Sequence, residues 1–95
     1  MKHYIICKFT DEAKENNHLV SSIKELYEKA TAVEGIKKVE FVQNCIDRPN
    51  RYDLMIILYI EKEKLPVWDS SDIHKKWKAE FGGCLAAKAI FDAEE

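Results

Sequence analysis

The sequence has no pair of closely spaced cysteines. Its three cysteines, Cys7, Cys45 and Cys84, are odd in number and widely separated, and no CxxC pair occurs. This spacing argues against a zinc knuckle, a redox motif and a disulfide framework. We expect all three to be free thiols, buried as small apolar side chains in a reducing compartment.

Long hydrophobic runs and an excess charge of one sign are also missing. No apolar stretch approaches the roughly 18–20 residues that a membrane span needs. The opening Met1-Lys2-His3 and the short run after it are too quickly polar for a signal peptide. The net charge is −2, with both signs mixed along the chain. These absences predict a cytoplasmic protein that binds neither membranes nor nucleic acid.

What is present is an ordinary globular composition. Hydrophobic residues make up 46% of the 95 residues and charged residues 34%, which is enough for a modest core and is not typical of disorder. No internal repeat and no low-complexity segment interrupts the chain. We therefore expect a single domain over residues 1–95.

The first half of the chain predicts a strand, a helix and a second strand. Residues 3–9 are rich in β-forming side chains. Apolar residues then recur every three or four positions, as a helix requires, at Leu19, Ile23, Leu26, Tyr27, Ala30 and Val33. Gly35 stands where a helix C-cap glycine belongs, and 36–46 is predicted to be a strand.

The second half repeats this order after a turn at 47–51, where the residues Asp-Arg-Pro-Asn-Arg favour reversal. Residues 52–60 form the strongest predicted strand. A cluster of N-cap residues at 69–72 precedes a helix with Ile73, Trp77 and Phe81 on one face. Gly82 and Gly83 end that helix, and 84–92 is predicted to be the last strand.

The predicted order β-α-β-β-α-β is that of the ferredoxin-like fold, an α+β architecture. It has a four-stranded antiparallel sheet with two helices on one face. The first and third strands are central in this topology, and they are also the most apolar strands of the chain.

These two central strands are apolar on both faces, although the helices can cover only one. Five large side chains point to the uncovered face, namely Tyr4, Ile6, Met55, Ile57 and Tyr59. Leaving them in water would forgo on the order of 10 kcal/mol, comparable with the net stability of a domain. We therefore expect a homodimer joined through this face. The alternative is a small-molecule cavity on that face of a monomer.

Several segments in order resemble the stress-responsive dimeric α/β-barrel (Dabb) family. They are Lys2-His3, Gly-Ile-Lys-Lys-Val-Glu-Phe-Val-Gln-Asn at 35–44, Arg-Pro-Asn-Arg-Tyr-Asp-Leu at 48–54, Leu65 with Trp68, His74, and Ile-Phe-Asp at 90–92. The resemblance spans nearly the whole chain. It implies a homodimer whose two sheets close into a dimeric α+β barrel with the helices outside. The family includes plant stress proteins, a plant polyketide cyclase and many bacterial members without known activity.

The cyclase of this family implies catalytic roles for His3 and His74. An imidazole that is neutral near pH 7 can remove a proton next to a carbonyl. Two features depart from the cyclase pattern. Trp68 replaces an assisting tyrosine and cannot act as an acid or base. Ser71 stands where the family's His-Pro-x-His motif begins.

Each candidate side chain also has a structural interpretation. His3 and His74 can be structural residues at a strand start and a helix start, and His18 is expected to be exposed. The aromatic set can line a ligand pocket between sheet and helices or simply form the core; it comprises Trp68, Trp77, Phe81, Tyr27 and Phe9. Arg48 and Arg51 can clamp an anion or be solvated loop charges.

The sequence thus predicts a cytoplasmic Dabb-type homodimer that binds a small apolar or aromatic carbonyl compound between sheet and helices. We expect no metal and no cofactor. One alternative is a cofactor-free proton-transfer enzyme that uses His3 and His74. The other is a purely structural stress protein.

Overall fold

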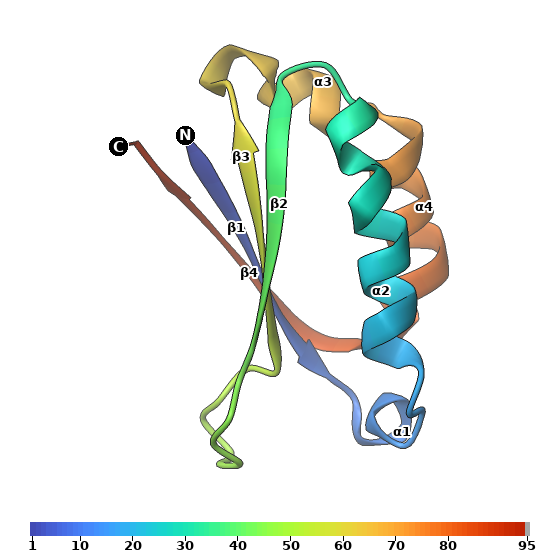
Figure 1. Ribbon diagram of the computed structural model, residues 1–95. Helices are drawn as coiled ribbons and strands as arrows, with labels where there is room; N and C mark the ends of the chain where they lie inside the picture. The colour runs from blue at the N-terminus through green and yellow to red at the C-terminus, as the bar shows by residue number, and fades with distance from the viewer. Residues whose placement is uncertain (95) are drawn as a thin grey trace.

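A computed structural model describes residues 1–94 and shows one antiparallel sheet. Its strands are β1 (Lys2–Phe9), β2 (Ile36–Gln43), β3 (Leu54–Ile60) and β4 (Leu85–Ala93), in the spatial order β2-β3-β1-β4. The predicted ferredoxin-like fold is therefore confirmed, with β1 and β3 in the centre. The two long helices, α2 (Leu19–Tyr27) and α4 (Asp72–Phe81), cover one face of the sheet (Figure 1).

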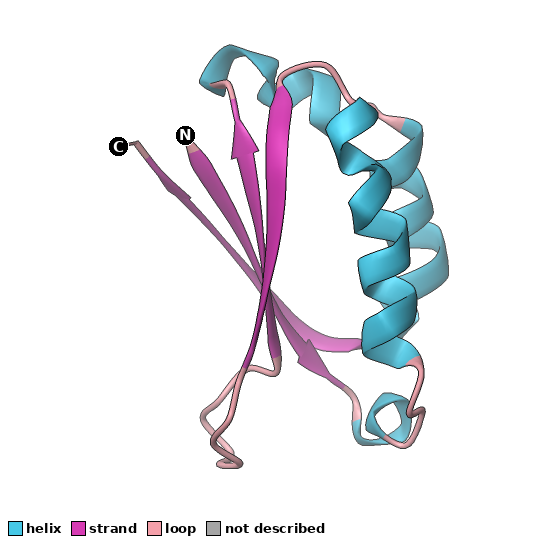
Figure 2. Cartoon of the chain, viewed as in Figure 1, coloured by secondary structure: helices cyan, strands magenta, loops and turns pink. Residues whose placement is uncertain are grey.

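Shorter helices and turns complete the chain (Figure 2). They are α1 (Asp11–Lys14), α3 (Leu65–Asp69) and the 3-10 turns η1 (Glu28–Ala32), η2 (Lys62–Lys64) and η3 (Gly82–Cys84). α1 and α3 are not among the helices predicted from the sequence. α1 buries no side chain, so it has no apolar stripe. It is instead fixed by Thr10, whose hydroxyl accepts a hydrogen bond from the Ala13 amide at 3.1 Å.

The helix boundaries predicted from the sequence are right for α4, whereas the first predicted helix extends beyond the end of α2. Ser71 caps α4 by accepting a hydrogen bond from the His74 amide at 3.2 Å, and Gly82 follows its last residue. α2 ends at Tyr27, and the apolar stripe continues through η1. Gly35 is therefore not the C-cap of that helix. It lies in the turn between η1 and β2, with φ of 94°.

The helix-facing side of the sheet forms the core. Along β1 the side chains alternate, so that His3, Ile5, Cys7 and Phe9 are buried beneath the helices while their neighbours are not. Trp68 of α3 and Trp77 of α4 pack over them and are almost fully shielded from solvent. The alternation places His3 on the helix-facing side, as its position in the strand predicted.

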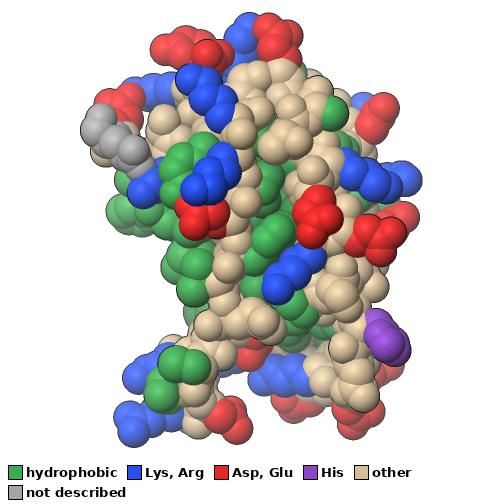
Figure 3. Space-filling model, in the orientation of Figure 1, with side chains coloured by type: hydrophobic (Ala, Val, Ile, Leu, Met, Phe, Trp, Pro, Cys, Tyr) green, Lys and Arg blue, Asp and Glu red, His purple; other side chains and the backbone are tan. Residues whose placement is uncertain are grey.

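The other face of the sheet has no helix over it. Tyr4, Ile6, Met55 and Tyr59 are half-buried there, whereas Ile57 is only 9% exposed because its neighbours on the same face screen it. On the outer strands Val42 is 50% and Phe91 63% exposed. Hydrophobic side chains accordingly reach the surface on the side of the sheet away from the helices (Figure 3).

The three cysteines are free, and they differ in exposure. Cys7 is buried, Cys84 is half-buried, and Cys45 is exposed. The prediction that all three are buried is therefore wrong for Cys45, which follows β2 in a loop instead of continuing that strand. Within residues 1–94, no helix is both long and apolar enough to span a bilayer.

Gly35 should be intolerant of a side chain. A methyl group there would overlap Cβ and Cγ of Lys64, and its positive φ strains any L-residue. The Gly35 carbonyl also accepts a hydrogen bond from the Glu61 amide at 3.0 Å, which ties β2 to the end of β3. We expect Gly35→Ala to lower the free energy of unfolding by about 1–3 kcal/mol, measured by urea denaturation.

Gly82→Ala is the matched control. Its added methyl group meets no atom within 4 Å and its backbone is right-handed helical, at φ of −54°. It should leave stability unchanged or raise it by up to about 1 kcal/mol. Equal losses in the two variants would contradict the role given to Gly35.

Candidate functional site

The first polar pair beneath the helices joins His3 to Asp92. The two residues face each other across β1 and β4, and His3 Nδ1 is hydrogen-bonded to the Asp92 carboxylate. His3 is only 6% exposed, whereas the Asp92 side chain is 38% exposed. A carboxylate that is hydrogen-bonded to Nδ1 fixes the orientation of the imidazole ring. It leaves Nε2 as the nitrogen that can accept a proton.

Asp92 was not among the site residues predicted from the sequence. It belongs to the Ile-Phe-Asp segment that resembles the Dabb family, but its link to His3 depends on strand register. The two residues are 89 positions apart in the chain. Spacing along the chain gives no signal for such a pair, and only the antiparallel pairing of β1 with β4 brings it together.

His74 lies in the first turn of α4 and has a different set of partners. Its Nδ1 is 2.9 Å from the carbonyl oxygen of Asp69. Because a carbonyl only accepts hydrogen bonds, Nδ1 carries the proton and Nε2 is the acceptor of the neutral ring. Burial lowers the pKa of His74 below its ordinary value, the Asp69 carbonyl partly offsets this, and Lys78 lowers it further. The ring is therefore neutral at pH 7.

The aromatic residues predicted to line a pocket are packed together. Ring centroids are 5.1 Å apart for His74 and Trp68, 5.7 Å for Trp68 and Tyr27, and 5.1 Å for Tyr27 and Trp77. The ring centroids of Trp77 and Phe81 are 5.7 Å apart. All of these rings except His74 are buried, and so is Phe9. In this structure they fill the space between sheet and helices, and their role as pocket lining stays a prediction.

One buried atom in this cluster lacks a partner. The Tyr27 hydroxyl is fully shielded from solvent, and no hydrogen-bond partner for it is found within residues 1–94. Burial raises the pKa of Tyr27, and the nearby Cys7 raises it further, so the hydroxyl keeps its proton. Buried hydroxyls are nearly always hydrogen-bonded in folded proteins, so this donor requires an explanation.

Cys7 lies close to this hydroxyl but is not a reactive thiol. Burial raises the pKa of Cys7 to about 11, although Lys88 on the neighbouring strand acts to lower it. A thiol with this pKa is protonated at neutral pH and is a poor nucleophile. Its role beside Tyr27 is that of a small apolar side chain.

The two histidines belong to separate polar regions. His3 contacts Asp92 and His74 contacts Trp68, and no hydrogen bond, ion pair or ring contact joins the two histidines in the part of the chain that the structure describes. His3 and Cys7 are four residues apart on one face of β1, which corresponds to about 13 Å along the strand.

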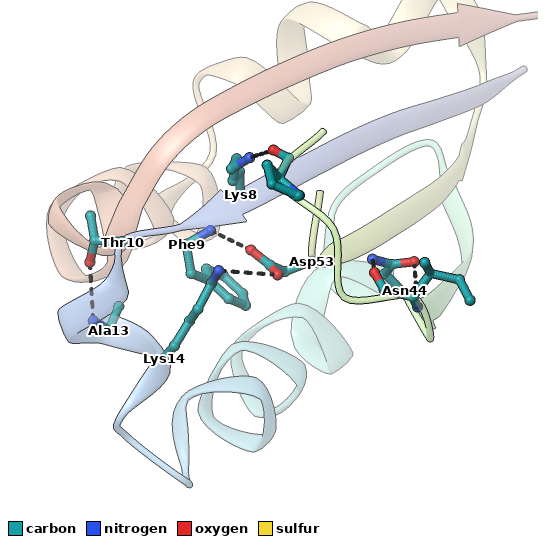
Figure 4. A network of polar contacts seen from close by, with 9 residues as sticks. Lys8, Phe9, Thr10, Ala13, Lys14, Asn44 and Asp53 are labelled. Carbon is teal, nitrogen blue, oxygen red and sulfur yellow. Dashed lines mark hydrogen bonds and ion pairs between the residues drawn. The ribbon is translucent and has the colours of Figure 1, made fainter. Parts of the chain in front are cut away.

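A groove of about 790 Å³ lies where the loop between β2 and β3 meets the end of β1. Asp53 anchors that loop, because its carboxylate accepts the Phe9 amide at 2.8 Å and lies 3.8 Å from Lys14 Nζ (Figure 4). Arg48 and Arg51 line the groove, as an anion clamp would require. Asp11, Asp47 and Asp53 line it as well, so its charges are nearly balanced and give little selectivity for an anion.

Within residues 1–94, no group of three or more histidine, cysteine, aspartate or glutamate side chains is arranged to hold a metal ion. The His3–Asp92 pair lacks a third ligand in that range. The side chains described at the candidate site carry imidazole, carboxylate, phenol and indole groups.

Comparison with known proteins finds similarity in structure only. No family model and no curated protein matches the sequence. A dimeric ferredoxin-like protein of unknown function from Bacteroides fragilis superposes with a TM-score of 0.79 at 19% identity, over 99% of this chain and 94% of that one. The hydroxynitrile lyase of Passiflora edulis superposes with a TM-score of 0.76 at 9% identity, over 95% and 87% of the two chains.

A Dabb family protein from Mesorhizobium loti with a ferredoxin-like fold is also similar. Its TM-score is 0.66 at 9% identity, over 99% of this chain and 94% of that chain. At identities this low, the structural similarity establishes the fold but leaves the chemistry open. The chain therefore has the ferredoxin-like fold that the order of its strands and helices predicted, and a Dabb family protein is among the proteins of similar structure.

Proposed function

We propose that the protein acts as a homodimer in which the uncovered faces of two sheets pack together into an α+β barrel. The apolar side chains of that face support this proposal, because Phe91 and Val42 on the outer strands are half or more exposed in a single chain. Tyr4 and Phe91 already form an edge-to-face pair there, with ring centroids 6.1 Å apart. The exposed free thiol of Cys45 suits a reducing compartment such as the cytoplasm.

Two neighbouring residues of β4 test the dimer. Phe91 is 63% exposed on the uncovered face, and Ile90 is 48% exposed on the opposite face, next to Ile5. We expect wild type to sediment with twice the 11.1 kDa mass of one chain. Phe91→Glu should shift the protein to a single-chain mass, because it places a charge in an apolar interface, at a cost of about 2 kcal/mol or more per protomer.

Ile90→Glu is the control and should sediment like wild type. Circular dichroism should show both variants folded. The dimer proposal fails if wild type is a stable single chain at micromolar concentration, or if both variants dissociate equally.

We further propose that each protomer binds a small apolar or aromatic carbonyl compound between sheet and helices. The unpartnered hydroxyl of Tyr27 carries this proposal. A buried donor without an acceptor costs about 1–3 kcal/mol, which a carbonyl oxygen placed beside it would recover. The surrounding rings offer the flat apolar contacts that an aromatic ligand needs.

Room for such a ligand requires Trp68 to move. Trp68 lies on α3, a helix of only five residues, whereas Trp77 lies in the middle of the ten-residue α4. Displacing a side chain from a short helix disturbs fewer backbone hydrogen bonds than displacing one from a long helix. The proposed opening is therefore at α3, and His74 is the polar group beside it, because its ring contacts Trp68.

Tyr27→Phe tests the ligand site with acetophenone as the probe. The variant should be more stable than wild type without ligand, by about 1 kcal/mol, because it removes an unsatisfied buried hydroxyl. Acetophenone should raise the melting temperature of wild type and leave that of Tyr27→Phe unchanged. Ethylbenzene has the same ring without the oxygen and should shift both proteins equally.

Two results would count against this site. If Tyr27→Phe is less stable than wild type, the hydroxyl already has a partner. If acetophenone and ethylbenzene shift wild type equally, the carbonyl is not recognised.

The pairing of His3 with Asp92 favours a second candidate function, proton transfer at a carbon next to a carbonyl. A carboxylate that orients a buried imidazole is a common arrangement for a general base. The hydroxynitrile lyase of similar structure is an enzyme, so this fold is compatible with catalysis. In this candidate His3 Nε2 removes the proton, and Asp92 stabilises the imidazolium that forms.

Deuterium exchange at the methyl group of acetophenone, followed by proton NMR in D₂O, tests this candidate. Wild type should accelerate the exchange over buffer, and His3→Gln should abolish the acceleration. Asp92→Asn should lower the rate by about 10²-fold or more while leaving the fold intact. His18→Gln, which changes an exposed histidine, should exchange like wild type. Equal rates for wild type and His3→Gln would exclude His3 as the base.

A further inference from the structure

An apolar groove of about 340 Å³ lies on the uncovered face of the sheet, where β2 and β3 lead into their connecting loop. Ile6, Val42 and Met55 line it from β1, β2 and β3, and Tyr52 lines it from the loop. The three strand residues all point away from the helices. The volume is at the low end of the range for ligand pockets, so the groove suits a single aromatic ring.

The same face carries an aromatic side chain that stays largely exposed in a single chain. Phe91 of β4 is 63% exposed, although its ring makes an edge contact with Tyr4. β4 and β2 are opposite edges of the sheet, so Phe91 and Val42 are three strand spacings, or about 14 Å, apart. The ring therefore cannot fill the groove of its own chain.

Strand register places the ring and the groove on either side of the middle of the sheet. Phe91 pairs with Tyr4, and Tyr4 pairs with Ile57, in one row of side chains across the face. Val42 stands in the next row, at the opposite edge. The midpoint between Phe91 and Val42 therefore lies over the two central strands. The apolar side chains around that midpoint are Tyr4, Ile6, Met55 and Ile57.

We propose that in the homodimer the partner's Phe91 occupies this groove, so that each subunit both provides and receives one ring. This inference rests on the proposed dimer and specifies how its two faces pack. When two sheets pack face to face, their twofold axis lies between the sheets and parallel to them. An axis that crosses the line from Phe91 to the groove at its midpoint, at right angles, places each ring opposite the groove of the other subunit.

This arrangement covers both exposed apolar features of the face at once. The same axis centres the contact on the most apolar part of the sheet. Aromatic side chains that fill pockets near the centre of an interface carry much of the binding energy. A small apolar molecule could also occupy the groove, but it would leave Phe91 exposed to water.

Dissociation constants of the dimer, measured by sedimentation, test the contact between Phe91 and the groove. Phe91→Ala should raise the constant at least about tenfold, and Val42→Ala should raise it at least about threefold. In the Phe91→Ala protein, Val42→Ala should have almost no further effect, because the ring that it contacts is already missing. Additive effects of the two substitutions would overturn the docking and leave the dimer in place.

Chemical cross-linking tests the same contact by distance. Cys45 lines the groove and is exposed, so the short reagent bismaleimidoethane should join Phe91→Cys to the partner's Cys45. Packed sheets are about 10 Å apart, a gap that such a reagent spans and a disulfide does not. Above its dissociation constant, Phe91→Cys should run as a dimer on a denaturing gel. Trypsin should then release residues 39–51 linked to residues 89–95.

Two variants are controls for the cross-link. Ile90→Cys places the thiol on the opposite face of β4, and Phe91→Cys/Cys45→Ser removes the thiol of the groove, so neither should give this linked peptide. The docking is overturned if Phe91→Cys sediments as a dimer but is not linked to Cys45, since the groove would then be open to a small molecule. If wild type sediments as a single chain, the dimer itself fails and the docking fails with it.

Discussion

The strict alternation of side chains along the two central strands is the constraint on which the rest of the molecule depends. β1 and β3 are each hydrogen-bonded on both edges, so every residue must point either toward the helices or away from them. Both sets are apolar in these strands. The side chains that point toward the helices are covered by α2, α3 and α4 of the same chain. The other, which includes Ile6 and Met55, has nothing above it in a single chain, and this makes a second sheet the natural cover.

The same alternation explains why the polar groups beneath the helices are few and isolated from each other. His3 is tolerated in a buried position because Asp92 on the neighbouring strand accepts its hydrogen bond. Tyr27 has no such partner in residues 1–94, although it is more deeply buried. The aromatic cluster therefore gains apolar contacts while leaving one hydroxyl unsatisfied. Phenylalanine would give the same contacts without that cost, so the hydroxyl is more easily understood as part of a binding site than as part of the core.

Much of the fold could be predicted because its signals are local. The strand and helix order, the cap at Ser71 and the central position of β1 all follow from short patterns in the sequence. α1 escaped prediction because it has no apolar stripe, and β2 was predicted too long because Cys45 and Ile46 are apolar yet lie in an exposed loop. The candidate site was harder. His3 was identified through the family resemblance, but Asp92 joins it through strand register across the whole chain. The missing partner of Tyr27 depends on packing that no spacing encodes.

The outer surface of the helices carries a separate constraint. α4 must bury Trp77 and Phe81, and this fixes which of its residues face outward. A face that only needed solvation would be served by charges of alternating sign, which pair along a helix. Here Lys75 and Lys76 stand together beside Lys29 from η1, and none of them is paired with a carboxylate in residues 1–94. Asp72, Glu25 and Glu80 line the same surface, however, so its three positive and three negative charges balance within the chain, and solvation alone accounts for this face.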